Sequence, residues 1–434
     1  MKTKLTAIVI SMILLAPWIA SAATIHVPVD QSTIQAGIDA AVNGDLVLVA
    51  PGTYVENIDF IGKAITVQSE GSVEGTIIDG GQIGSVLTFI SGETRRTIIK
   101  GFTIRNGHGT TLPASDNSTG GGILCVMSHP KIMDCIVEAN NASAGGGIYV
   151  ESSLARIEGC TIRGNEAVVY GGGVYGSKSV LRVTNCTIEE NGANWSGGGL
   201  CLLESFARIS NCTISGNDAS HIGGGVETIW SLSLIDRCTI SGNTADVGGG
   251  SHHSHSTAWM ENTLVSDNSC RHFGAGVYCR QAFLKAAFCT VAGNAVTHGL
   301  GEGGGFWSTD SSILWIEDSI LWGDTASAGA EFALYDDAVA VVSHSDVQGG
   351  EGAVYVHPEV PGSYHWLFGN MDQDPLFVGG GDYHLTADSP CIDAGTDAGV
   401  DMDIDGEMRP QGAGFDIGAD EFVSSHSCFI WLVM

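Results

Sequence analysis

The sequence predicts an all-β fold, a parallel β-helix solenoid with a short capping helix at its N-terminal end and an irregular cap at its C-terminal end. The first observation behind this prediction is a repeat of about 25 residues, a period typical of solenoids. The second is that each unit contains short β-branched segments that alternate with period two, without a helical period. Glycine, at 61 of 434 residues, supplies the tight corners that such a coil needs.

The repeat is defined by the motif Cys-Thr-Ile-x-x-Asn. The motif begins at Cys160, Cys186, Cys212 and Cys238, and at Cys289 with Val in place of Ile. Its Asn column extends in both directions, through Asn106, Asn140, Asn165, Asn191, Asn217, Asn243, Asn268 and Asn294. Three short strands with their turns fill about 25 residues, which is one coil of a parallel β-helix, and successive coils stack about 4.8 Å apart.

Residues in matching columns are expected to lie directly above one another. An inward-facing ladder of free thiols is then formed by Cys135, Cys160, Cys186, Cys212, Cys238 and Cys289, continued at one coil by Thr263. The Asn column can hydrogen-bond to neighbouring backbone, and the Gly triplets permit positive φ and close approach of coils. We interpret these three columns as architecture.

Both ends of the solenoid must be covered, because they expose strand edges. Residues 32–44 predict a short amphipathic helix that Ser32 or Thr33 caps and Asn43-Gly44 ends, and a strand is expected over residues 46–49. We expect a signal peptide over 1–22, an N-terminal cap with the first coils over 23–100, β-helix repeats over 101–324, irregular last coils over 325–366, a C-terminal capping module over 367–423 and a tail over 424–434.

The start of the chain predicts export. Lys2 and Lys4, an apolar run over residues 7–16 and the small residues Ala20-Ser21-Ala22 match a secretory signal cleaved after Ala22. We therefore expect a secreted or cell-surface protein. No later stretch approaches the roughly 20 apolar residues of a transmembrane helix.

The net charge of −30 narrows the choice of partners. Such a chain would repel a phosphate backbone and an anionic bilayer surface. We expect no nucleic-acid partner, and a monomer.

Residues 33–54, from Thr33 to Tyr54, resemble the opening of the pectin lyase-like superfamily of right-handed parallel β-helices. The Cys-Thr-Ile-x-x-Asn and Gly-triplet coils resemble the repeats of exported bacterial members, and residues 374–377, 389–395, 403–406 and 416–422 resemble the closing module common after such helices. The resemblance implies a right-handed solenoid and makes polysaccharide the default ligand class. One fold hosts many activities, however, so it does not select a reaction.

Catalytic patterns of the superfamily are poorly represented in this chain. Gly107-His108-Gly109 matches the Gly-His-Gly of polygalacturonases, but no paired-Asp motif precedes it, and glycoside hydrolysis needs two carboxyls flanking the bond. A lyase of the pectate type would need a Ca²⁺-binding carboxylate cluster beside an Arg base. No such cluster is evident within the coils.

One column follows each Gly triplet by two positions and is expected to face outward. Its members are Leu124, Tyr149, Tyr175, Cys201, Glu227, His252, Tyr278 and Trp307. Aromatic rings on a rigid face suit stacking against sugars, so its Tyr and Trp residues are candidates for carbohydrate binding. Glu227 beside His252 offers a general acid/base pair. The alternative is cross-strand stacking that only stiffens the sheet.

A second column precedes the triplets by two positions, at the rim of the same corner. Its members are Trp195, His221, Asp246 and His272. Trp195 and His221 are further candidates for carbohydrate binding, and His272 joins Glu227 and His252 as a candidate catalytic residue. Close by, His252, His253 and His255 fall within four residues, but on a strand His252 faces away from the other two, so a three-His metal site would need a bulge.

Four cations precede successive ladder cysteines by four residues: Lys131, Arg156, Arg182 and Arg208. Neighbouring coils bring these like charges about 5 Å apart, where they repel unless negative charge lies between them. Acids such as Glu158 and Glu204 can supply that charge. The alternative is a track for an acidic polysaccharide such as a uronan, with Arg156, Arg182 and Arg208 as its binding residues.

Asp401, Asp403 and Asp405, followed by Gly406, resemble the first half of a calcium loop, in which oxygen ligands alternate. The twelfth position is Gly412 rather than Glu, so the loop is not an EF-hand. We predict calcium here, assisted by Glu407 or Asp416. The alternative is that these acids only solvate the module.

Taken together, these patterns predict an exported β-helix that presents a rigid face to extracellular polysaccharide, as a surface or matrix component. The competing hypothesis is a polysaccharide lyase or glycoside hydrolase acting on an acidic glycan through Glu227, His252 and His272.

Overall fold

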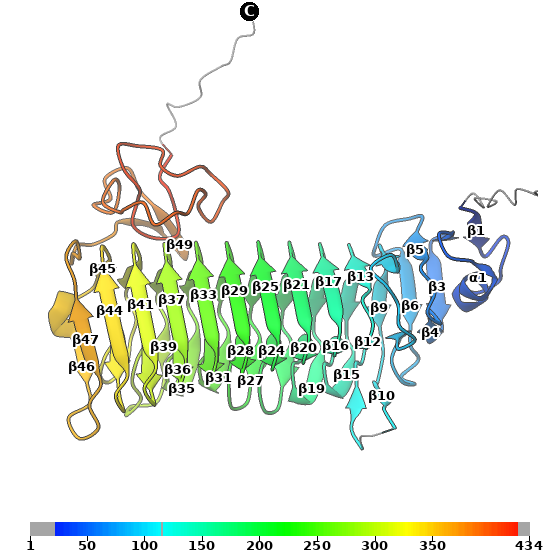
Figure 1. Cartoon of the computed structure of the whole chain (residues 1–434), viewed down its shortest axis with the longest axis horizontal. Helices are drawn as coiled ribbons and strands as arrows, with labels where there is room; N and C mark the ends of the chain where they lie inside the picture. The colour runs from blue at the N-terminus through cyan, green and yellow to red at the C-terminus, as the bar shows by residue number, and fades with distance from the viewer. Residues whose placement is uncertain (1–21, 114–115, 424–434) are drawn as a thin grey trace, which may run out of the picture.

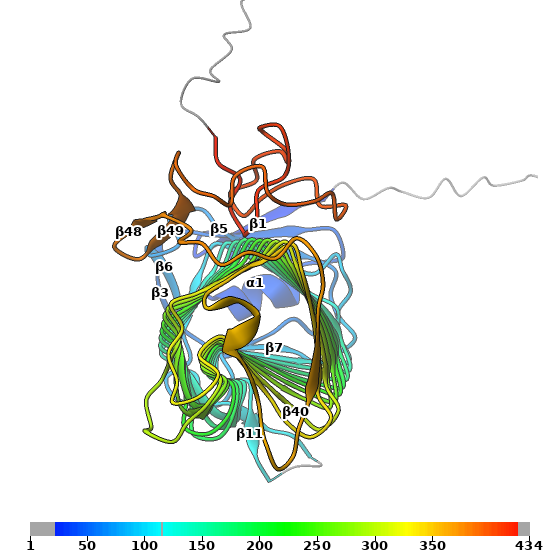
Figure 2. The same ribbon diagram turned by 90° about the vertical axis from the view of Figure 1, so that its left-hand side faces the viewer.

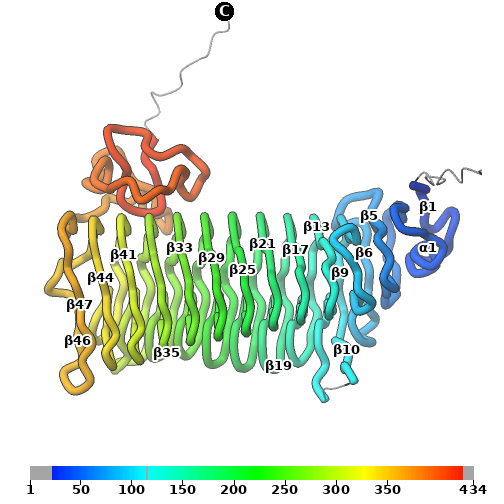
Figure 3. The backbone as a smooth tube through the Cα atoms, viewed as in Figure 1, coloured from blue at the N-terminus to red at the C-terminus, as the bar shows by residue number. Residues whose placement is uncertain are grey.

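The computed structural model describes residues 22–113 and 116–423, and within them the chain forms one long β-helix (Figures 1 and 3). The predicted signal peptide and tail lie outside the described residues, apart from Ala22 itself. Successive coils stack along one axis and build four parallel sheets, of 14, 12, 12 and 9 strands, which we call sheets A, B, C and D. Within these ranges no helix is long and apolar enough to cross a membrane.

One coil illustrates the path of the chain. Strand β16 (Ile148–Glu151) belongs to sheet C, β17 (Leu154–Glu158) to sheet A, β18 (Thr161–Arg163) to sheet B and β19 (Glu166–Tyr170) to sheet D. Sheet D is the exception to purely parallel pairing, because its first two strands, β10 (Thr110–Thr111) and β11 (Ser118–Thr119), pair antiparallel. In the middle of the solenoid each coil thus has four strands, one more than the three expected from the sequence.

Sheet A is the longest sheet and runs the whole length of the solenoid. Its strands, in spatial order, are β1 (Thr24–Val27), β2 (Leu46–Val49), β5 (Thr66–Ser69), β8 (Ile98–Lys100), β13 (Lys131–Met133), β17, β21 (Val180–Thr184), β25 (Phe206–Ser210), β29 (Leu232–Asp236), β33 (Thr257–Glu261), β37 (Phe283–Ala287), β41 (Ile313–Glu317), β44 (Val339–Ser343) and β47 (Ser363–Trp366).

Residues of matching columns are in register between coils, as the repeat predicts. Arg156 pairs with Arg182 and Arg182 with Arg208 across adjacent strands. The six ladder cysteines are all free and buried, and they belong to the main apolar core. Because most inward positions are apolar, the coils close around one continuous core along the axis.

The Asn column links the coils by hydrogen bonds, which confirms its architectural role. In a typical rung the Nδ2 of Asn217 donates to the carbonyl of Ile188 at 2.9 Å and to Oδ1 of Asn243 at 2.9 Å. The Gly triplets let the coils approach closely: a Cβ on Gly172 would lie 2.3 Å from the carbonyl oxygen of Gly192. No residue other than Gly fits that position.

The N-terminal helix α1 (Ile34–Ala40) covers the first coils. Thr33 is its N-cap, with its side chain accepting a hydrogen bond from the Ala36 amide, and Ile34 and Ile38 are buried in the core. The helix ends earlier than the sequence predicts, because Ala41 is already extended and the Val42 amide bonds to the Asp45 carboxylate at 2.8 Å.

The C-terminal segment leaves the coil after β47 and folds back along the flank of the solenoid (Figure 1). It contains a short hairpin, β48 (Phe377–Gly379) and β49 (Asp382–Leu385). Leu385, Cys391 and Ile417 pack on Ile320, which lies on the outer face of sheet B in β42 (Ile320–Trp322). At the end of the solenoid, the 3₁₀ helix η1 (Gly350–Ala353) lies across the coil opening (Figure 2).

Candidate functional site

The outer face of sheet A carries a row of cationic and aromatic side chains that one leucine interrupts. Cα pairing places eight consecutive residues in this row, which we call the sheet A row: Lys131, Arg156, Arg182, Arg208, Leu234, Trp259, Lys285 and Trp315. Five of the 18 Lys and Arg residues of the chain are therefore in one line. In a protein with a net charge of −30, that concentration makes this face electrostatically distinct.

The arginines of the row are available to a ligand. Arg182 and Arg208 are exposed and Arg156 is partly exposed. None of the three forms an ion pair or a side-chain hydrogen bond in the described part of the chain, although Glu158 lines the same groove. Among the described residues, therefore, no direct ion pair with a nearby acid relieves the repulsion between the three arginines.

The three arginines line grooves on this face. One groove, of about 290 Å³, has Leu154, Val180 and Phe206 beside them, with Arg95 at its edge. A second, of about 310 Å³, continues on the other side of the row, where hydroxyls and the side chains of Asn211 and Arg237 line it. The face therefore combines positive charge with apolar surface on one side and polar groups on the other.

The row continues beyond the residues that the sequence analysis selected. Trp259 is 42% exposed and Trp315 is 38% exposed. Lys285 and the indole of Trp315 both bind Glu317, at 2.6 and 2.9 Å. These residues also stand four positions before members of the ladder column, at Thr263, Cys289 and Ser319, so the same spacing rule could have found them.

The column two positions after the Gly triplets is buried, so the expectation of an exposed aromatic stripe is wrong. Its members are at most 8% exposed, namely Leu124, Tyr149, Tyr175, Cys201, Glu227, His252 and Trp307, except that Tyr278 is partly exposed. These side chains do point away from the main core. They fill a crease between sheets C and D. In one coil, for example, the sharp turn at Gly171, where φ is 65°, brings Tyr175 of sheet C against Tyr170 of sheet D.

The predicted carbohydrate-binding residues Tyr149, Tyr175 and Trp307 are buried in this crease, where their rings pack against neighbouring aromatic rings. Tyr149 and Tyr175 stack with ring centroids 5.3 Å apart, and Tyr278 stacks on Trp307 at 4.5 Å. Cross-strand stacking, the alternative considered for this column, describes what these rings do.

The predicted catalytic residues are only partly brought together. Glu227 and His252 are neighbours in the crease, 3.5 Å apart, and the thiol of Cys201 donates to Glu227 at 3.5 Å. His272 is on the rim instead, with its ring against His298. The two histidines beside His252 also diverge: His253 points into the core, where burial lowers its pKa to about 3, and His255 packs on Trp230.

The rim column remains at the surface. Trp195 is 50% exposed, its ring packs on His221, and His221 lies 3.4 Å from Asp246. Carbohydrate binding by Trp195 and His221 stays a prediction.

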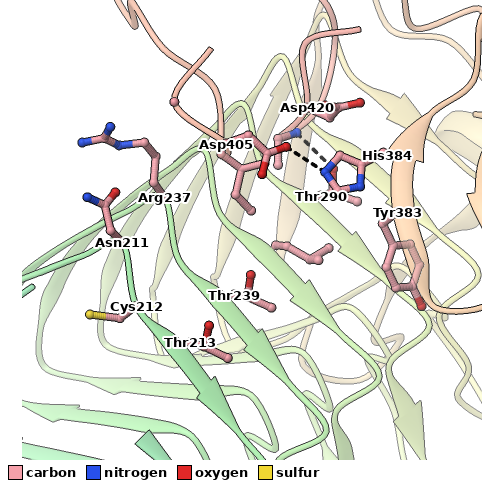
Figure 4. Close-up of a pocket in the computed structure, with 14 residues that line it drawn as sticks. Asn211, Cys212, Thr213, Arg237, Thr239, Thr290, Tyr383, His384, Asp405 and Asp420 are labelled. Atoms are coloured by element: carbon pink, nitrogen blue, oxygen red, sulfur yellow. Dashed lines mark hydrogen bonds and ion pairs between the residues drawn. The ribbon is translucent and has the colours of Figure 1, made fainter. Parts of the chain in front are cut away.

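A cavity of about 420 Å³ lies where the C-terminal segment meets sheet B (Figure 4). Its floor is the outer face of sheet B, including Thr213, Thr239 and Leu264, and its wall is formed by the C-terminal segment. Asn211 and Arg237 line both this cavity and the groove beside the sheet A row. Among the residues that line this cavity, Asp405 alone was a predicted metal ligand, and the sequence does not indicate that the others meet it because the two sides of the cavity are far apart along the chain.

His384 is the central group of the cavity wall. Its Nε2 lies 2.8 Å from Asp405 and its Nδ1 2.5 Å from Asp382. Burial lowers the pKa of His384, but the hydrogen bonds to the two carboxylates outweigh it and raise the pKa to about 9.

The three aspartates predicted to bind calcium are not gathered around one point. Asp403 is fully buried, and its carboxylate accepts hydrogen bonds from the amides of Asp405, Glu407 and Glu421. Asp401 is exposed, and Asp405 faces His384 across the cavity wall. Calcium binding stays a prediction, and Asp405 is the one member of the set that adjoins other metal-capable groups within the described residues.

The chain belongs to the right-handed β-helix family. The model of the family, described as "Right handed beta helix region", matches residues 32–193 and 169–321. No curated protein matches the sequence.

Solved structures with a similar fold share little sequence with this chain. Pectate lyase Pel9A is 12% identical, with 94% of this chain and 98% of that chain covered and a TM-score of 0.41. PfbA, a surface adhesin of Streptococcus pneumoniae, is 12% identical, with 73% and 82% covered and a TM-score of 0.34. A mannuronic acid specific polysaccharide family 6 lyase from human gut microbiota is 12% identical, with 78% and 87% covered and a TM-score of 0.30.

Proposed function

We propose that this protein binds an acidic extracellular polysaccharide along the outer face of sheet A. The observation that carries the proposal is the line of Arg156, Arg182 and Arg208 on three consecutive coils, exposed or partly exposed and without ion-pair partners among the described residues. The predicted signal peptide would place this face outside the cytoplasm.

The spacing of the row suits a polymer with repeated charges. Coils stack about 4.8 Å apart, so the guanidinium groups follow one another at nearly the interval of sugar units in an extended chain. Guanidinium binds carboxylate and sulfate groups with paired hydrogen bonds. The polymer would lie along the solenoid axis, crossing the strands.

The neighbouring side chains support a sugar polymer rather than an isolated anion. Leu154, Val180 and Phe206 offer apolar surface to the C–H faces of sugar rings, while the arginines bind the acidic substituents. Farther along the row, Trp259 and Trp315 are exposed enough for ring stacking.

Binding without catalysis is the function that the side chains favour. Glu227 and His252 are buried in the crease and His272 is on the rim, so this trio does not meet at one accessible point. The row itself contains no carboxyl, and the carboxyl pair beside it, Asp236 and Glu261, lies on adjacent strands next to Arg208 and Trp259.

The test is glycan retention by the protein and by charge variants. Arg182→Gln is expected to weaken binding of polyuronates about 10- to 100-fold, because a charge-assisted hydrogen bond contributes roughly 1.5 to 3 kcal/mol. The triple variant Arg156→Gln, Arg182→Gln, Arg208→Gln should retain no polyuronate. Raising the salt concentration should weaken polyuronate binding by the unmodified protein. Arg271→Gln, an exposed arginine away from the row, is the matched control.

Two results would contradict the proposal. One is equal retention of neutral and acidic glycans, and the other is unchanged retention by the triple variant. Reducing ends and unsaturated products, measured in the same incubations, would reveal cleavage and so support the enzyme hypothesis instead.

A further inference from the structure

The cavity beneath the C-terminal segment contains a group of side chains that glycan binding on sheet A does not use. His384, Asp405 and Asp420 each offer a ligand atom, and the three atoms lie within 4.8 Å of one another. They come from separate parts of the segment and converge on the cavity shown in Figure 4.

Carboxylates alone at a surface do not make a metal site, but this group is centred on an imidazole. Asp382 accepts from Nδ1 of His384 at 2.5 Å, which fixes the ring and directs Nε2 toward Asp405. A carboxylate that orients the far nitrogen of a histidine is a recurring feature of metal-binding histidines, because it sets the tautomer and strengthens the ligand.

The other two ligands are also held in place by the backbone. The amide of Asp405 is bonded to the buried Asp403 carboxylate at 3.0 Å, which fixes the turn that carries Asp405. Asp420 is 8% exposed and accepts from the Leu385 amide at 2.7 Å through one oxygen, so β49 positions both His384 and Asp420. The backbone thus positions the ligands, while Nε2 of His384 and the Asp405 carboxylate, 2.8 Å apart in a hydrogen bond, must separate slightly to admit an ion between them.

The local charge favours a cation. Asp382, Asp405 and Asp420 surround one imidazole, and the arginine that lines the cavity, Arg237, is directed to Asp236 and Met402. One nitrogen and two carboxylate oxygens are donors that suit zinc and related transition metals better than the all-oxygen sets of calcium.

We propose that His384, Asp405 and Asp420 bind a divalent transition metal such as Zn²⁺, with Asp382 as the carboxylate that orients the histidine. Three protein ligands leave at least one coordination position open. That position faces the cavity, whose opposite side is sheet B and whose edge, at Asn211 and Arg237, joins the groove of the sheet A row. The site can therefore take a further oxygen ligand from a molecule in the cavity.

The test uses the whole protein and zinc alone. After equilibration with Zn²⁺ and removal of the unbound ion, elemental analysis is expected to find one equivalent of zinc per chain, and Co²⁺ in its place should give the visible absorption of a low-coordinate ion. His384→Asn and Asp405→Asn should each abolish stoichiometric binding. Asp382→Asn should weaken binding about 10- to 100-fold while keeping the stoichiometry.

His365→Asn, a change at an exposed histidine of β47, is the matched control and should bind zinc like the unmodified protein. Circular dichroism confirms that each variant is folded. Failure to bind one equivalent of zinc, or full binding by folded His384→Asn, overturns the proposal. Calcium binding that survives His384→Asn, with no zinc bound, also overturns it in favour of an all-oxygen site. None of these measurements involves a glycan, so they stand apart from the test of the sheet A row.

Discussion

The Asn ladder ends at an aspartate, and this end is expected to make the stability of the protein depend on pH. Asn294 donates to Oδ1 of Asp324 from its backbone amide at 2.7 Å and from its side chain at 2.9 Å. Oδ2 of Asp324 occupies the position that Nδ2 has in the asparagines of the ladder. A Cβ placed on Gly305 would lie next to this oxygen, just as a Cβ placed on Gly276 would lie next to Nδ2 of Asn294. An amide would donate there, and a carboxylate cannot.

Asp324 is also paired with a second buried carboxyl, Glu331. The two are 4% and 2% exposed, and neither Oδ2 of Asp324 nor Oε2 of Glu331 has a donor from elsewhere in the described chain. Burial raises the pKa of Asp324 to about 7, and burial followed by repulsion from Asp324 raises the pKa of Glu331 well above its usual value. The folded protein therefore favours the protonated pair.

The sign and size of the effect follow from these shifts. A carboxyl whose pKa is raised by folding contributes stability that is fully present below its unfolded pKa, near 4, and that is lost as the pH rises through the folded pKa, near 7. A rise of about three units corresponds to about 4 kcal/mol of unfolding free energy for Asp324. Asp324→Asn removes this loss and restores the donor, so the variant should gain most at pH 8 and little at pH 4.

Guanidinium unfolding followed by circular dichroism, at a series of pH values from 4 to about 9, measures the difference between the variant and the unmodified protein. Titrating groups that do not interact with Asp324 cancel in that difference, and Glu331, whose pKa Asp324 raises, adds to it in the same direction. Asp388→Asn, a change at an exposed carboxyl of the C-terminal segment, is the control and should show no such trend. A stability difference for Asp324→Asn that is constant across the series would refute the reasoning.

Two further predictions concern the core and the C-terminal segment. Thiol reagents should leave the ladder cysteines of the native protein largely unmodified and should label them after denaturation, as mass spectrometry of labelled peptides would report. Rapid labelling of the native protein would contradict the burial of these thiols. The positions are Cys135, Cys160, Cys186, Cys212, Cys238 and Cys289. Arg409→Met should destabilise the C-terminal segment by about 3 to 5 kcal/mol, because Arg409 is fully buried, binds Glu421 at 2.9 Å and leaves that carboxylate unpaired when removed. Limited proteolysis should then cut residues 367–423 while the coils stay intact, and an unchanged digestion pattern would count against this role.

The coil and its register could be predicted from the sequence because both depend on local periodicity. Matching letters about 25 residues apart are stacked as expected, from the buried cysteines to the Asn hydrogen bonds and the arginines of sheet A. In a solenoid each coil contacts mainly its neighbours, so a repeat in sequence becomes a repeat in space.

The accessibility of side chains could not be predicted in the same way. Tyr175 was expected to face solvent because it alternates with inward residues, and it does point away from the core. It is buried because the positive φ of Gly171 folds sheet D back against sheet C, a bend that period-two alternation does not encode.

The sequence by itself determined the fold class, the coil register, the ladders and the line of arginines, since all follow from short-range repetition along one axis. Only the tertiary structure decided which outward side chains stay exposed and where the C-terminal segment packs. The contact of Leu385 and Ile417 with Ile320, and the meeting of His384 with Asp405 and Asp420 above Thr213 and Thr239, join non-repeating segments. Their position depends on which apolar surfaces fit together when the chain folds back, and no period in the sequence specifies that fit.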